Sequence, residues 1–209
     1  MLSIPIILLL LVFIFITGER LSPIRLPIWL IMFCGGALSI LLQQISLTQA
    51  WHAINWNLIG FLFGVFLLAE ALEKSHVMHN ISIVIERSTL NSSVLLLCFI
   101  LVSAAVSALL MNDTMAIIGI PLCFTLSRSC QQPTSIWLLA LAFAVTIGSV
   151  ISPIGNPQNL FIALHIDHQN PFALFFSHFW LITLINLLVC FMLIRMSYRQ
   201  HFHHSTPKS

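Results

Sequence analysis

Long runs of hydrophobic residues alternate along this chain with short polar breaks. The runs cover about residues 2–17, 26–45, 57–72, 92–111, 115–127, 135–165 and 172–195. Several of them reach the roughly 20 residues that a helix needs to cross a bilayer. None shows the alternation of apolar and polar residues that barrel strands require. The pattern predicts an all-α, polytopic helical bundle embedded in the lipid bilayer.

One run is interrupted between Ser149 and Asn159. The interruption reads Ser152-Pro153-Ile154-Gly155-Asn156-Pro157-Gln158-Asn159. Unwound backbone at membrane depth is tolerated only where it is buried in protein or lines a watery cavity, and broken helices of this kind are typical of transporter binding sites. We therefore expect a broken transmembrane helix. Its second half should begin with Asn156 as N-cap and Pro157 at the first helical position.

The stretch from 92 to 127 either crosses the membrane once, as a long broken helix, or enters and returns to the same side. The basic residues decide between these, because short cytoplasmic loops carry the excess of Lys and Arg. Only a return, with the first helix starting outside, places every basic residue inside: Arg20, Arg25, Lys74, Arg87, Arg128, Arg195, Arg199 and Lys208. The prediction is a plasma or inner membrane protein with an external N-terminus, a membrane part over 1–196 and a cytoplasmic tail over 197–209.

We expect Glu70 to pair with Lys74 at the inner end of its helix.

The limb that returns, residues 115–127, would extend only about 20 Å as a helix, short of the roughly 30 Å hydrocarbon core. Its tip, Asn112-Asp113-Thr114, should therefore lie inside the membrane, as in a re-entrant hairpin. The alternative is an ordinary polar turn outside the bilayer, with the break an ordinary loop between two short helices.

Two helix starts would then point toward one region. Asn, Asp and Thr are residue types that cap helix starts, and the positive ends of two helix dipoles can hold an anion. Carbonyl oxygens at the ends of the preceding limbs, beside Asn112, Ser149 and Ser152, suit Na⁺ or another hard cation. Asp113 either couples transport to a cation or a proton, or only caps the helix.

Composition excludes several other classes of function. The chain has 209 residues, of which 59% are hydrophobic and 7% charged, with a mean hydropathy of +1.03. These values leave little room for a soluble domain. The sequence has no H-E-x-x-H and no G-x-S-x-G motif, so we do not expect an enzyme. It lacks a basic stripe for nucleic acid, and its motifs indicate no cofactor and no metal centre.

The segments MNDTMAIIGIPL and GSVISPIGNPQNLFIA together resemble the hairpin-tip and broken-helix motifs of the ion transporter superfamily. That superfamily includes arsenite and antimonite permeases, citrate and divalent-anion transporters, and sodium–proton antiporters. The resemblance covers nearly the whole chain in element order and implies a secondary transporter of a small inorganic or carboxylate anion. At the tip, Met111 and Asp113 depart from the dicarboxylate branch, which usually has Ser before the Asn and generally no acid after it. The expected site combines the implied residues Asn112, Thr114, Gly155, Asn156, Pro157, Gln158 and Asn159 with Asp113, Ser149 and Ser152.

Members of this superfamily carry two inverted copies of such a unit and bind substrate between them, whereas this chain contains a single inverted-repeat unit. A complementary second half would complete a half-transporter. The other interpretation is a truncated, non-transporting membrane protein or a scaffold derived from such a permease. The charge bias argues against an antiparallel homodimer, while a parallel homo-oligomer stays open.

Overall fold

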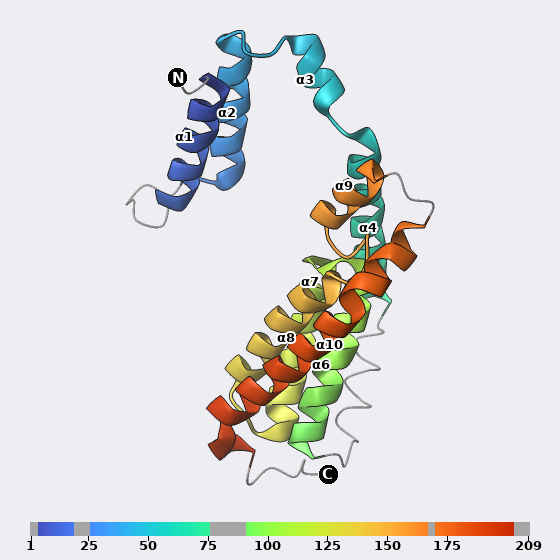
Figure 1. Cartoon of the computed structure of the whole chain (residues 1–209). Helices are drawn as coiled ribbons and strands as arrows, with labels where there is room; N and C mark the ends of the chain where they lie inside the picture. The colour runs from blue at the N-terminus through green and yellow to red at the C-terminus, as the bar shows by residue number, and fades with distance from the viewer. Residues whose placement is uncertain (1–3, 19–25, 76–90, 167–169, 203–209) are drawn as a thin grey trace. The chain divides into compact units, whose positions relative to one another are not determined.

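The computed structural model describes residues 4–18, 26–75, 91–166 and 170–202, and all regular structure in these ranges is helical (Figure 1). This confirms the all-α prediction. The chain divides into two compact units, Met1–Trp56 and Asn57–Ser209. The second unit contains both polar interruptions that the sequence singled out.

In the first unit, helices α1 (Ile4–Gly18) and α2 (Ile28–Leu41) pack side by side. Their close approach depends on Gly35, because a Cβ atom there would lie 2.5 Å from a methyl group of Val12. The hydrophobic runs 26–45 and 57–72 leave residues 46–55 as an external loop between them, and this expectation is wrong in part, since α3 (Leu47–Ala53) forms there. The Ser46 hydroxyl accepts from the Gln49 N–H at 3.2 Å and the Gln49 side chain accepts from the Ser46 N–H at 2.9 Å. This capping box was readable as S-x-x-Q.

The second unit begins with α4 (Trp56–Lys74). The predicted pair between Glu70 and Lys74 is confirmed, with Nζ 2.7 Å from a carboxylate oxygen. Both side chains are well exposed, so the pair contributes little to stability.

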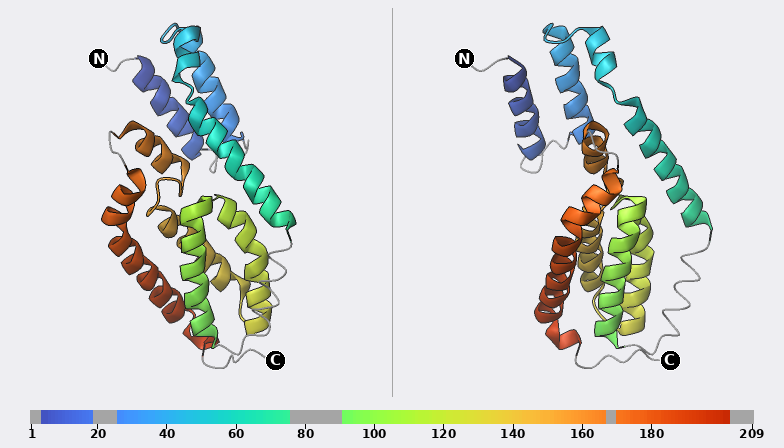
Figure 2. Two further views of the ribbon diagram at one scale, coloured as in Figure 1. Left: turned by 90° about the vertical axis from the view of Figure 1, so that its right-hand side faces the viewer. Right: turned by 45° about the vertical axis from the view of Figure 1, so that its right-hand side comes forward.

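Four further helices form the main bundle of this unit: α6 (Ser92–Leu110), α7 (Asn112–Cys130), α8 (Thr134–Ser149) and α10 (Pro171–Ser197). Helix α8 packs against each of the other three (Figure 2). Its fully buried Trp137 lies within the hydrophobic core, with its ring 5.7 Å from that of Phe99 in an edge-on arrangement. The broken span and the hairpin are therefore held in one packed body.

Two small residues set how closely α6 and α8 approach. A Cβ atom on Gly148 would collide with the backbone of Ala104. Near this contact the buried Ser107 hydroxyl donates to the Val145 carbonyl oxygen at 2.7 Å. Small residues and hydroxyl bonds of this kind are the usual means of packing membrane helices closely.

The chain turns back at Met111, which confirms the hairpin. The predicted length of the returning limb is wrong. Helix α7 runs from Asn112 to Cys130, three residues beyond the prediction at each end, and extends about 28 Å at 1.5 Å per residue. The shortness argument for a tip in mid-bilayer therefore fails. The tip still lies short of the full height of the unit, because α9 (Pro157–His165) lies beyond it in every view (Figures 1 and 2).

The base of the hairpin is tied to the end of α10. The Ser127 hydroxyl donates to the Gln132 carbonyl oxygen at 2.7 Å, and the Gln132 amide donates to the His201 carbonyl oxygen at 3.0 Å. His201 closes the short 3₁₀ helix η2 (Arg199–His201).

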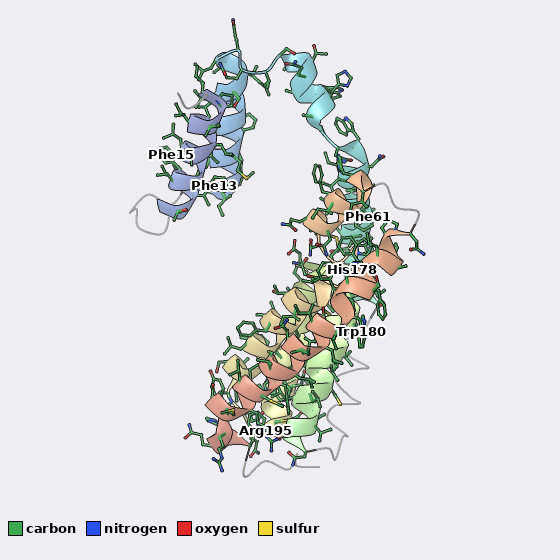
Figure 3. All side chains as sticks on the ribbon, in the orientation of Figure 1. Phe13, Phe15, Phe61, His178, Trp180 and Arg195 are labelled. Carbon is green, nitrogen blue, oxygen red and sulfur yellow. The ribbon has the colours of Figure 1, made fainter. Side chains whose placement is uncertain are left out.

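This tie gathers basic residues at one end of the bundle. Arg128 is in the last turn of α7, Arg199 begins η2, and Arg195 lies at the opposite end of α10 from His178 and Trp180 (Figure 3). The arrangement is the one that the charge argument predicted for these three residues. The other basic residues of that argument, Arg20, Arg25, Arg87 and Lys208, and most of the predicted tail lie outside the described residues.

Among the described helices, α6 and α10 are each long and apolar enough to cross a membrane, and α3 with the first part of α4 adds a third if they form one span. Helices α1, α2 and α8 are shorter but also apolar. Many large hydrophobic side chains are exposed along these helices (Figure 3). Such apolar surfaces are those of a membrane protein.

Candidate functional site

The tip of the hairpin is a single residue, Met111, between the end of α6 and the start of α7. Its backbone has φ 71° and ψ 140°, and its side chain is only 1% exposed. A residue with a Cβ atom rarely adopts this conformation, and such strain concentrates at functional sites. No pattern in the sequence indicates this strain, because Met111 looks like the end of a hydrophobic run.

The predicted capping of α7 is wrong in its details. Helix α7 begins at Asn112 itself, and Met111 at the N-cap position makes no side-chain cap. The Asn112 carbonyl oxygen Oδ1 accepts from the N–H of the next residue, Asp113, at 2.8 Å. Asp113 is exposed in the first turn, where its negative charge complements the positive end of the helix.

A backbone hydrogen bond joins the hairpin tip to the break. The Asn112 N–H donates to the Gly155 carbonyl oxygen at 2.8 Å. Gly155 can lie this close because it has no side chain: a Cβ atom there would collide with the Ser149 carbonyl group. The start of α7 and the residue just before the α9 cap are thereby held in contact, as the sequence predicted for two helix starts.

The break itself follows the prediction closely. Helix α8 ends at Ser149, and α9 begins at Pro157 with Asn156 as its N-cap. The Asn156 Oδ1 accepts from the Asn159 N–H at 2.8 Å. Proline fits the first position because its missing N–H would have no helical partner there. The residues between, 150–156, are turns and bends.

The carbonyl oxygens at the end of α8 already accept hydrogen bonds, contrary to the expectation that they are exposed and suit a cation. The Asn159 amide nitrogen lies 3.2 Å from the Ser149 oxygen, 3.4 Å from that of Val150 and 2.9 Å from that of Ser152. Helix ends leave their last carbonyls without helical partners. Here the Asn159 side chain, in the first turn of α9, adds a donor to the Ser149 and Ser152 carbonyls, which also accept backbone N–H groups at 3.5 and 3.2 Å, and gives the Val150 carbonyl its donor.

Three hydroxyl groups near the tip and the break are buried. Ser149 donates to the Thr146 carbonyl oxygen at 2.9 Å, and the Asn156 amide approaches its oxygen at 3.4 Å. The Ser152 hydroxyl accepts from the Ile154 N–H at 3.3 Å. Thr114 is 1% exposed, and its hydroxyl has no hydrogen-bond partner among the described residues. A buried unsatisfied hydroxyl requires an explanation, such as a water or a bound ligand.

The structure thus places the predicted residues in two small groups that meet at one bond. Asn112, Asp113 and Thr114 lie at the start of α7, and Ser149, Ser152, Gly155, Asn156, Pro157, Gln158 and Asn159 lie in the break and the first turn of α9. Asp113 and Gln158 are the exposed members. Oxygen atoms are the ligands that the site could offer to a hard cation. In the described part of the chain, no cluster of three His, Cys, Asp or Glu residues suits a metal ion.

Comparison with known proteins shows the family of this chain. Residues 6–208 match the family described as citrate transporter (CitMHS). The chain belongs to the citrate transporter family. Membership confirms the resemblance to the ion transporter superfamily, and with the apolar helices it makes the chain a membrane protein of a transporter family. No solved structure matches this chain significantly.

Several curated proteins are similar to parts of this chain. It is 36% identical over 115 residues to the inner membrane protein YbiR of Escherichia coli, covering 54% of the chain and 31% of that protein. It is 30% identical over 131 residues to a silicon efflux transporter of Oryza sativa subsp. japonica, covering 63% and 27%. It is 26% identical over 168 residues to the P protein of Homo sapiens, covering 78% and 20%. The matches thus span less than a third of each of these relatives.

Proposed function

We propose that this chain is a subunit of a secondary transporter that moves a small inorganic or carboxylate anion across the membrane. The substrate would be held between the α6–α7 tip and the α8–α9 break. The observation that carries the proposal is the hydrogen bond from the Asn112 N–H to the Gly155 carbonyl oxygen, which brings two helix starts together among apolar helices. Family membership and a relative named as a silicon efflux transporter support it.

The charges at the site favour coupling to a cation. Residues 110–116 and 148–160 contain no Lys and no Arg, so an anion would be held by amides, hydroxyls and the positive ends of α7 and α9. Asp113 is exposed at the tip and would repel a multiply charged anion. We therefore propose that Na⁺ or H⁺ accompanies or exchanges with the substrate and offsets this repulsion.

The proposed pocket needs a second wall. One hairpin and one break provide one face of a site that related transporters build from two inverted units. We propose that a complementary half, or further copies in a homo-oligomer, supplies the other face. The assembly would lie in the plasma or inner membrane, with the basic end of the bundle, including Arg128 and Arg195, toward the cytoplasm.

Uptake into proteoliposomes tests the function. Citrate, arsenite and silicic acid would be offered under a Na⁺ or a pH gradient, with the chain alone and with any chain that copurifies. At least one should be taken up, and Thr114→Val should reduce uptake roughly tenfold, the equivalent of losing one hydrogen bond of about 1.5 kcal/mol. The matched control is Asn186→Ala, which removes an exposed amide on α10 that donates to the Ile182 carbonyl oxygen.

Two results would contradict the proposal. A correctly folded chain that takes up none of these substrates, with or without its copurifying partner, would favour the non-transporting alternative. Uptake that is insensitive to Thr114→Val and Asn112→Ala would place the substrate elsewhere in the assembly.

A further inference from the structure

The side chain of Asn159 faces three carbonyl oxygens at once. Its amide nitrogen lies within 2.9 to 3.4 Å of the oxygens of Ser149, Val150 and Ser152. Carbonyl oxygens only accept hydrogen bonds, and of the two ends of an amide only the nitrogen donates. The chemistry of the surroundings therefore fixes which end of Asn159 faces the break.

The backbone N–H and the side-chain amide of Asn159 both donate within the break. Its backbone N–H donates to the Asn156 side chain, and its amide satisfies the end of α8. Helix α9 belongs to none of the closely packed helix pairs among the described residues. Those pairs are α1 with α2, α8 with each of α6, α7 and α10, and α6 with each of α7 and α10. Hydrogen bonds across the break, those of the Asn159 amide and the 3.4 Å approach of the Asn156 amide to the Ser149 hydroxyl, therefore help to fix α9 relative to α8.

The other amides divide into two kinds. Asn156 caps α9 with its oxygen and approaches the Ser149 hydroxyl with its nitrogen. Asn112 uses only its oxygen, toward the Asp113 N–H. Gln158 is exposed, and its side chain makes no hydrogen bond to the described part of the chain. Among the described residues at the two helix starts, the amide groups left free to bind a ligand are therefore the nitrogen of Asn112, at the start of α7, and the amide of Gln158, in the first turn of α9.

We infer that Asn159 is a positioning residue that fastens α9 to the end of α8, and that Asn112 and Gln158 present the amides that contact the substrate. Only the second inference, that Asn112 and Gln158 contact the substrate, rests on the proposed function. Without the Asn159 amide, the Val150 carbonyl oxygen loses its donor, and those of Ser149 and Ser152 keep only the backbone N–H groups of Ser152 and Gly155. The side-chain link between α9 and the end of α8 is then lost, and α9 becomes free to turn about the break. If the competent arrangement falls to about a tenth of the population, the apparent KM for transport rises about tenfold.

Distance measurement between spin labels tests the fastening without any transport. Labels at Leu139 on α8 and Leu164 on α9, both exposed, report the angle across the break. The labels are introduced after the exposed thiols of Cys34 and Cys98 have been replaced by Ser. A second pair, Val102 on α6 and Leu188 on α10, reports on the packed bundle.

The full chain should give a single narrow distance distribution for both pairs. Asn159→Ala and Asn159→Asp should add a second distance population for the pair across the break, because neither side chain donates to three carbonyls, and leave the bundle pair narrow. Gln158→Ala and the matched amide control Asn186→Ala should leave both pairs unchanged. In uptake assays Gln158→Ala should raise KM with no change in these distances.

An unchanged distribution across the break in Asn159→Ala would overturn the inference, as would a second population in Gln158→Ala. If Asn159→Ala disturbs both pairs, Asn159→Ser decides: its shorter donor should keep the bundle pair narrow and widen only the pair across the break, and any other result overturns the fastening. A chain that transports nothing would defeat the proposed function while the distance result for Asn159 stands by itself.

Discussion

Gly155 lies where two backbone segments meet, with the Asn112 N–H on its carbonyl oxygen and the Ser149 carbonyl group against its Cα. In Gly155→Ala the new Cβ atom would collide with backbone atoms that cannot rotate away. We expect a loss of about 1–3 kcal/mol in stability, which is typical of overpacking. The melting temperature in detergent should fall accordingly.

The control for this substitution is Gly64→Ala in α4, where a Cβ atom would meet nothing within 4 Å. Alanine is the better helix former, so the melting temperature should stay equal or rise. Equal melting temperatures for Gly155→Ala and the unchanged chain would mean that the break does not approach Ser149 as described.

Met111 offers a second test at the level of one residue. Met111→Ile keeps an apolar side chain of similar size but places a branched Cβ at φ 71°, which β-branched residues tolerate worst. The matched substitution is Met115→Ile, at a buried position of regular helix one turn later. Thermal unfolding should show Met111→Ile to be less stable than Met115→Ile by about 1–3 kcal/mol. Equal stabilities would contradict the strained tip.

At this scale, sequence predicts what local rules determine. Asn156 and Pro157 follow from the chemistry of helix starts, and the structure confirms both. The hydrogen bonds of the Asn159 side chain and the burial of the Thr114 hydroxyl depend on segments that come together only in the fold. No local pattern encodes them, so Asn159 was grouped with the ligands by resemblance alone.

The packing of helices α6, α7 and α8 allows a graded prediction. In Gly148→Ala the new methyl group would collide with the Ala104 backbone, whereas in Gly119→Ala it would meet the Leu141 side chain, the nearest atom at 2.5 Å. A leucine side chain can change rotamer and a helix backbone cannot. Gly148→Ala should therefore lower the melting temperature more than Gly119→Ala, and the reverse order would contradict the α6–α8 contact.

Helices were mostly predictable because hydrophobic runs mark them directly. The exceptions have local causes. The prediction for the returning limb is too short because Asn112, Asp113 and Thr114 look like a turn in the sequence. These polar residues form the first turn of α7 instead, and the free Asn112 N–H of that turn donates to the Gly155 carbonyl oxygen. Hydrophobic runs do not predict helix α3, because its seven residues are too few to span a membrane and only its capping box marks it in the sequence.

The arrangement of the whole bundle predicts which segments share one side of the membrane. Gln131 in the α7–α8 turn and Gln200 in η2 lie at the end where Gln132 contacts His201, whereas His165 ends α9 beyond the hairpin tip. Single cysteines at 131 and 200 should react with an impermeant maleimide from the cytoplasmic side only, and a cysteine at 165 from the other side only. Labelling of 131 and 200 from opposite sides would contradict the bundle.

Basic residues were sufficient to predict that α7 returns, since that choice depends on a count of charges and on no contact. The meeting of the tip with the break was predictable because the helices that begin after the two interruptions run in opposite directions, which points their starts toward one region. The link between Gln132 and His201 was not, because both residues look like ordinary polar ends of helices. Long-range bonds of this kind, from a side chain to a distant carbonyl oxygen, leave no trace in composition or spacing.

That link also orders the events of biosynthesis. Gln132 leaves the ribosome 69 residues before the carbonyl group that it finally contacts. Helices α6, α7 and α8 can associate while α10 is still being translated, but the base of their turn stays open to water until the last turn of α10 has been made and inserted. The hydrogen bond from Gln132 to His201 therefore forms last. In a chain whose translation is stalled near Met196, we expect α6, α7 and α8 to be packed while Gln132 still lacks this bond.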